Sequence, residues 1–181
     1  MTTPESKDLI KKVFDLGLAA FFKMHGFKVV GANDKGFSFL CEIESDWNRL
    51  IKLETDYFNS EFVSFDGMIM ELKRMPEIRT RPDASLHIIR SVGQAAYMQI
   101  KRNKMMAGKK SDNAVAPWSV IAHYIGENKE SFWGYEVGPE DVDLFVETLS
   151  SWPNSSLREF NQQILQLKMF KRQSLGHRPK P

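Results

Sequence analysis

The apolar residues of this chain come in short runs, and that feature most limits what the chain can fold into. The longest run, Leu16 to Phe22, is far short of the roughly 20 residues needed to cross a bilayer. Short runs separated by polar turns require several elements that bury one shared core. A chain of 181 residues with 42% hydrophobic content is large enough to bury such a core in a single domain.

The remaining composition points to an intracellular protein without disulfides. The opening "MTTPESKDLIKK" is charged and lacks the apolar centre of a signal peptide, so we expect a cytoplasmic location. Cys41 is the only cysteine, which excludes an internal disulfide and a cysteine-rich zinc site. It lies in a predicted strand with no evident base beside it, and we expect a buried, inert thiol.

The first half of the chain predicts one helix and a β-meander. Thr3 and Gly26 are placed to begin and end a helix from Pro4 to Met24. The segments "FKVV" and "GFSFLCEIE" predict a hairpin around a polar turn. "RLIKLETDYF" and "FVSFDGMIMELK" are predicted as two further strands, because "LIKLET" in the first of them contains β-branched residues and has an alternating pattern. A helix over "SDWNRLIKLETDYF", capped by Ser45, is the alternative.

The second half predicts more helix. Apolar periodicity favours a helix over residues 83–107, followed by a hairpin of "SVIAHYI" and "SFWGYEV". Pro139 is expected to open a helix ending near Trp152. Ser155 or Ser156 is expected to cap a last helix that ends near Gln173.

These elements together predict the α+β class, with helices covering an antiparallel β-meander in a single domain. We expect residues 1–153 to form this domain and residues 154–173 to form a helix packed on it. Residues 174–181 are expected to be a flexible basic tail.

Charge is distributed unevenly along the chain although the net charge is only +2. Residues 1–71 carry −4, residues 72–111 carry +8, residues 112–159 carry −7 and residues 160–181 carry +5. Such asymmetry is typical of a surface for nucleic acid or an acidic protein. The basic and acidic segments could instead pair within one fold, or between two copies in a homodimer.

The binding reading names a set of candidate residues. On the helix predicted over residues 83–107, several polar side chains fall along one stripe beside the apolar face, and the remaining candidates are bases after it. The set is Arg90, Gln94, Tyr97, Lys101, Lys104, Lys109, Lys110, Lys171 and Arg172. No membrane partner and no cofactor are expected.

A competing interpretation is catalytic. On a strand over residues 62–73, Glu71 and Lys73 would project from the same face, where a carboxylate can hold Mg²⁺ and a lysine can orient a water. With Asp56 on the preceding strand, the three resemble the metal site of the restriction-endonuclease-like superfamily, which implies a metal-dependent nuclease. Members of that superfamily place Gln and Tyr four residues apart on the next helix, whereas Gln94 and Tyr97 are three apart.

The catalytic interpretation is the less favoured one. The same acid–x–lysine spacing recurs at Glu5–Lys7 and Glu127–Lys129, so it has little specificity. A bulge or turn at Gly67 would leave Glu71 in water on an ordinary strand. We therefore expect a binding protein, with the nuclease as the alternative. A small-ligand pocket lined by Trp118, Trp133 and Tyr135 is a third option.

A broader resemblance concerns architecture. The segments "FFKMHGFKVVG", "GFSFLCEIE", "RLIKLETDYFNSEFVSFDGMIMEL" and "SFWGYEVGPEDVDLFVETL" resemble a family of small bacterial proteins known as a domain of unknown function. The resemblance covers residues 8–75 and 131–160 and departs from the family at residues 76–111. It implies a compact α+β fold and carries over no catalytic residues.

Overall fold

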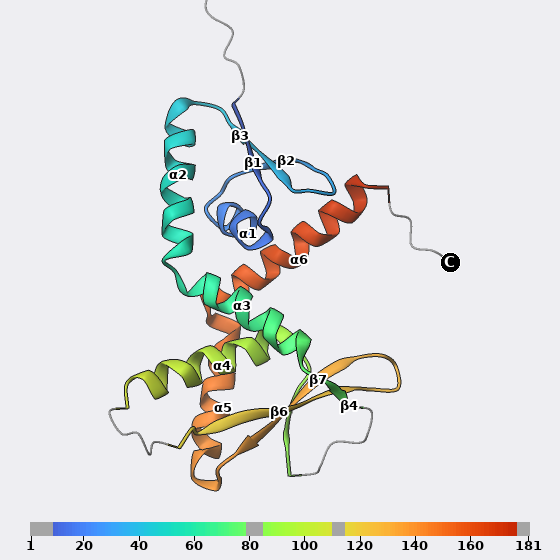
Figure 1. Ribbon diagram of the computed structural model, residues 1–181. Helices are drawn as coiled ribbons and strands as arrows, with labels where there is room; N and C mark the ends of the chain where they lie inside the picture. The colour runs from blue at the N-terminus through green and yellow to red at the C-terminus, as the bar shows by residue number, and fades with distance from the viewer. Residues whose placement is uncertain (1–8, 79–84, 110–114, 177–181) are drawn as a thin grey trace, which may run out of the picture. The chain divides into compact units, whose positions relative to one another are not determined.

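A computed structural model describes residues 9–78, 85–109 and 115–176 of the protein (Figure 1). It confirms the α+β class: helices accompany two sheets, one of them fully antiparallel. The described residues form two compact units. We call unit 1 the described parts of 1–63 and 159–181, and unit 2 those of 64–158. The predicted domain boundary at residue 153 stays a prediction.

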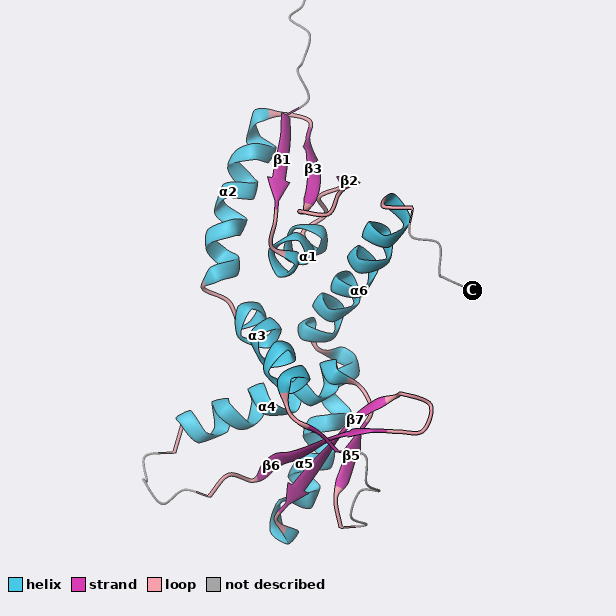
Figure 2. Cartoon of the chain, turned by 45° about the vertical axis from the view of Figure 1, so that its right-hand side comes forward, coloured by secondary structure: helices cyan, strands magenta, loops and turns pink. Residues whose placement is uncertain are grey.

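The three-stranded sheet of unit 1 is built from β1 (Leu9–Val13), β2 (Val29–Ala32) and β3 (Phe37–Cys41), in the order β1-β3-β2 (Figure 2). Both pairings are antiparallel, and Leu9 lies opposite Cys41 in the first of them. The predicted hairpin is confirmed. Its turn is held by Asn33, whose side-chain oxygen accepts hydrogen bonds from the backbone N–H groups of Lys35 and Gly36, both at 2.9 Å.

The helix predicted from Pro4 to Met24 is wrong in its first half. Residues 9–13 form strand β1, and the helix α1 covers only Leu16–Met24. The Asp15 side chain caps α1 by accepting a hydrogen bond from the backbone N–H of Leu18 at 2.6 Å. The part of the prediction before Leu9 lies outside the described residues. Pairing with β3 therefore prevails over the helical spacing of apolar residues at 9–13.

The two strands predicted between residues 49 and 73 are also wrong, and both segments are helical. Helix α2 covers Glu44–Phe58 and helix α3 covers Glu61–Arg74. The alternative of a helix over "SDWNRLIKLETDYF" is confirmed, although α2 begins at Glu44, one residue before the proposed Ser45 cap. The buried residues recur every three or four positions, as helices require: Leu50, Leu53 and Tyr57 on α2, and Phe65, Ile69 and Leu72 on α3.

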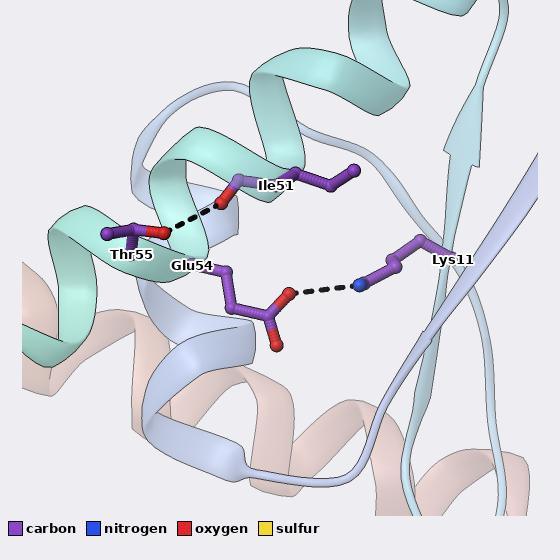
Figure 3. A network of polar contacts seen from close by, with 4 residues as sticks. All are labelled: Lys11, Ile51, Glu54 and Thr55. Carbon is purple, nitrogen blue, oxygen red and sulfur yellow. Dashed lines mark hydrogen bonds and ion pairs between the residues drawn. The ribbon is translucent and has the colours of Figure 1, made fainter.

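Polar and aromatic contacts connect the elements of unit 1. Lys11 of β1 forms an ion pair with Glu54 of α2 at 2.9 Å (Figure 3). In the same view, the hydroxyl of Thr55 donates to the carbonyl of Ile51 within α2. Helix α6 (Ser156–Ser174) places Phe160 against the ring of Phe62, with ring centres 4.9 Å apart. The predicted last helix is thus confirmed.

Unit 2 holds a four-stranded sheet in the order β4-β6-β7-β5. Its strands are β4 (Glu77–Ile78), β5 (His87–Ile89), β6 (Trp118–Ile125) and β7 (Ser131–Val137). The β6–β7 pair is the predicted hairpin, which is confirmed, and the short β4 runs parallel to β6.

The helices of unit 2 depart from the prediction mainly at one start. Helix α4 covers Val92–Ala107, so it begins well after residue 83, and residues 87–89 form β5 instead. The Ser91 hydroxyl caps α4 by accepting from the backbone N–H of Gln94 at 3.5 Å. The predicted helix opened by Pro139 is confirmed as a short 3₁₀ turn, η1 (Pro139–Asp141), followed by α5 (Val142–Ser151). A second turn, η2 (Trp152–Asn154), precedes α6.

Helices α4 and α5 pack on the same face of the unit 2 sheet. The Tyr135 hydroxyl donates to the carbonyl of Ala95 in α4 at 2.8 Å, and the indole N–H of Trp118 donates to the carbonyl of Met98 at 3.2 Å. Phe145 of α5 packs against the rings of both aromatic residues. Within the described residues, none of these helices or those of unit 1 is long and apolar enough to span a membrane.

Candidate functional site

The environment of α4 changes abruptly along its length. Seven of its first nine residues are buried, the last of them Ile100. From Lys101 to Lys109 no residue is buried. We call residues 101–109, with the sequence "KRNKMMAGK", the basic segment. This segment carries four cations, and no acidic residue occurs between 84 and 111.

Three of the four cations of the basic segment, Lys101, Arg102 and Lys109, have neutral partners. The Lys101 ammonium lies 5.2 Å from the centre of the Tyr97 ring. Arg102 donates to the side-chain oxygen of Gln99 at 3.1 Å, and Lys109 donates to the carbonyl of Val115 at 3.3 Å. Within the described residues, no carboxylate pairs with these three side chains. Their positive charge is therefore uncompensated locally.

The other members of the predicted stripe do not continue this surface. Tyr97 is buried, with 2% of its surface exposed, and its hydroxyl bonds to the Ser151 hydroxyl at 2.6 Å. Arg90 is exposed but lies in the loop before α4, and Gln94 is half-buried in the first turn. The single helical stripe from Arg90 to Lys104 is therefore a wrong prediction, because the helix begins at Val92. Lys110 lies outside the described residues.

The second predicted basic group belongs to unit 1. Lys171 of α6 donates to the carbonyl of Asp34 at 2.8 Å, and its ammonium lies 5.8 Å from the centre of the Phe37 ring. Arg172 is exposed. Lys171 thus contributes to packing within unit 1, and Arg172 is the more accessible cation.

The residues of the catalytic interpretation lie on helices. Asp56 is exposed on α2, and Glu71 and Lys73 are exposed on α3. Residues two apart on a helix are separated by about 200° around its axis, so Glu71 and Lys73 do not share a face. The same-face premise of the nuclease site was wrong. Among the described residues there is no group of three or more His, Cys, Asp or Glu side chains that could hold a metal ion.

The aromatic residues proposed to line a ligand pocket belong to the core of unit 2. Trp118, Trp133 and Tyr135 are at most 3% exposed. Each donates to a backbone carbonyl, as Trp133 does to Leu72 at 3.2 Å. Burial raises the pKa of Tyr135 far above its usual value, and nearby Gln99 and Arg102 partly oppose that rise. These rings are core residues with satisfied polar groups.

Cys41 is buried in β3, as expected. Burial raises the pKa of its thiol, and the carboxylate of Asp46 raises it further. A raised pKa keeps the thiol protonated at neutral pH, and a thiol is a poor nucleophile in that form.

Three polar residues of unit 2 escaped the sequence interpretation. Within the described parts of the chain, buried side-chain nitrogens of Gln99, Arg102 and His123 have no hydrogen-bond partner. Gln99 follows the apolar run "AAYM", and His123 stands between Ala122 and Tyr124 in a strand. A polar side chain at a position that the periodicity assigns to the core was the available signal.

Comparisons with protein-family models, with curated proteins and with solved structures found no match to this chain. The resemblance to the small bacterial family stays a prediction, and the candidate surface must be judged from its own geometry.

Proposed function

We propose that this protein is a non-catalytic binding protein that engages an anionic macromolecule, a nucleic acid or an acidic protein, through the basic segment of α4. The observation that carries the proposal is the change at Lys101. There α4 leaves the buried interior of unit 2, and no described carboxylate neutralises Lys101, Arg102 or Lys109.

The helix dipole accounts for part of this charge but not all of it. Cations near a helix C-terminus are stabilised by about 0.3–1 kcal/mol, an effect confined to the last turn. Lys104 lies in that turn. Lys101 and Arg102 lie earlier, and Lys109 lies beyond the end of the helix. The helix dipole therefore explains only Lys104, whereas binding of an external anion explains all four cations of the basic segment.

Pairing with the acidic residues 112–159 was the competing explanation. Lys101, Arg102 and Lys109 contact an aromatic ring, an amide oxygen and a backbone carbonyl instead. This favours an external partner. The nuclease alternative assumed a strand over residues 62–73, and this segment is part of helix α3.

Salt dependence tests the proposal. Labelled RNA, duplex DNA and poly-glutamate are titrated with the protein at 50 and 200 mM salt. If six phosphates are contacted, affinity for DNA falls on the order of 10³-fold between these concentrations, because bound counterions are released. Absence of binding to all three polyanions at 50 mM salt overturns the proposal.

A matched pair of variants locates the surface. Replacing Lys101, Lys104 and Lys109 together by Gln removes three cations from the basic segment. For duplex DNA this should reduce the logarithmic salt slope by roughly 3. The control replaces Lys12, Lys35 and Lys52, which are exposed in unit 1, by Gln. Equal weakening by both triple variants would show that net charge, rather than this surface, drives binding.

A further inference from the structure

An interior layer of unit 2 contains polar side chains with unsatisfied nitrogens. Trp133 and Tyr135 are two residues apart on β7, so they lie on one face of the sheet. His123 is the cross-strand partner of Trp133, and their rings stack 4.9 Å apart and parallel to within 2°. Tyr135 bonds to Ala95 of α4. His123 therefore lies on the face that α4 covers.

Gln99 lies one turn after Ala95 on α4, on the side that faces this layer. It is 3% exposed, and His123 is 4% exposed. The side-chain oxygen of Gln99 accepts the hydrogen bond from Arg102, while its Nε2 has no partner. Among the residues that the structure describes, the buried Arg102 Nε has no partner, and neither ring nitrogen of His123 has one. Gln99 and Arg102 also lie close enough to Tyr135 to lower its pKa against the effect of burial.

These unsatisfied groups have a common chemistry. Gln99 Nε2 and Arg102 Nε can only donate hydrogen bonds. Among the described residues, the one hydrogen-bond partner of the Arg102 side chain is a neutral amide oxygen. Arg102 is half-buried, and removing part of a charged group from water without an opposite charge is unfavourable. An ordered water would satisfy a donor without neutralising the guanidinium. A small anion would do both.

We infer that Arg102 and Gln99 form a binding site for a small oxyanion in the layer between α4 and the β6–β7 face. Arg102 supplies its Nε–H and the positive charge, and Gln99 supplies its side-chain N–H₂. Planar guanidinium groups match the spacing of phosphate and carboxylate oxygens. Arg102 is half-buried where α4 leaves the core.

This inference goes beyond macromolecular binding and does not depend on it. The lysines of the basic segment offer ammonium groups to an extended polyanion, whereas the buried Nε of Arg102 and Nε2 of Gln99 are donors for a single oxyanion. A phosphate group free in solution and one carried by a larger molecule share the required chemistry. Inorganic phosphate therefore probes the site without engaging an extended surface.

The test uses the full chain at constant ionic strength, with chloride replaced stepwise by phosphate or sulfate. We expect saturable binding in calorimetry and a rise in unfolding temperature that saturates with it. Arg102→Gln should weaken binding by roughly 10- to 100-fold, as expected for loss of a charged hydrogen bond. Arg74→Gln, which removes the same charge from an exposed position at the end of α3, should bind as the unmodified protein does.

A second measurement does not depend on how the variants fold. In the unmodified protein, the NMR signals of Arg102 Nε–H and of the Gln99 side-chain amide should shift along one saturable curve as phosphate is added. A linear, unsaturable response, or equal weakening by Arg74→Gln, overturns the inference. Saturable phosphate binding without polyanion binding would support the oxyanion site and contradict the proposed function. Polyanion binding without saturable phosphate binding would support the proposed function and contradict the oxyanion site.

Discussion

At the scale of single residues, Gly17 shows how a missing side chain positions a helix. A Cβ atom at Gly17 would lie 2.1 Å from the hydroxyl oxygen of Tyr57, a side chain of α2 that is 3% exposed. The glycine therefore lets α1 approach the Tyr57 ring closely. No property of the sequence around Gly17 indicates this contact, because its partner lies 40 positions away.

Gly17→Ala should destabilise unit 1 despite the better helix propensity of alanine. Alanine gains at most about 1 kcal/mol over glycine in a helix, whereas forcing a methyl group into a packed core costs about 1–3 kcal/mol. We expect a net loss of roughly 1–2 kcal/mol in the free energy of unfolding, measured by urea denaturation. Tyr57→Phe should relieve the overlap in the double variant. An unchanged or raised stability of Gly17→Ala would contradict the contact.

At the scale of elements, α3 is the segment where the sequence was most misleading. "MIMEL" alternates in a way that fits a strand with its apolar residues inward. In the structure Met70 is 46% exposed and Ile69 is buried, so the alternation does not describe the environment. Gly67, interpreted as a turn or bulge, lies inside the helix with open space around the position of a Cβ.

Gly67→Ala distinguishes the helix from the predicted turn. In an open helix interior, alanine should stabilise the protein by about 0.5–1 kcal/mol relative to glycine. In a turn with positive φ at residue 67, the same change would be destabilising. Urea denaturation followed by circular dichroism gives the sign. Gly67→Ala and Gly17→Ala are chemically identical changes, and they should have opposite effects on the free energy of unfolding.

Glu71→Ala tests the exposed face of the same helix. Glu71 is exposed, so the free energy of unfolding should change by no more than about 0.5 kcal/mol. The purified protein should also leave single- and double-stranded DNA intact in the presence of Mg²⁺ or Mn²⁺. Cleavage that is abolished by Glu71→Ala would restore the nuclease alternative.

At the scale of the whole molecule, the uneven charge along the sequence largely cancels within each unit. The segment 64–158 carries twelve bases and twelve acids, and the segments 1–63 and 159–181 together carry thirteen and eleven. A nearly neutral unit exerts little attraction on an anion beyond about one Debye length, roughly 10 Å at 0.1 M salt. Binding by the basic segment should therefore depend on local contacts, as the triple variant is designed to show.

Elements that depend on their own residues were predictable from the sequence. The hairpin around Asn33 is closed by that residue's side chain, and Pro139 and Ser155 act within one turn of the helices that follow them. Each of these signals involves atoms a few residues apart. The α+β class follows from them, because the two hairpins and the later helices were identified correctly.

Elements that depend on a distant partner were decided only by the tertiary structure. Residues 9–13 have helical spacing, but β3 offers them a row of backbone hydrogen-bonding groups, and they become a strand. Residues 49–73 alternate like strands, but their buried side chains meet the core every three or four positions. The unsatisfied donors of Gln99 and Arg102 likewise arise from packing against Tyr135 and its sheet. A local sequence determines which conformations are accessible, and long-range packing selects among them, because burial and backbone pairing outweigh propensity differences of about 1 kcal/mol or less per residue.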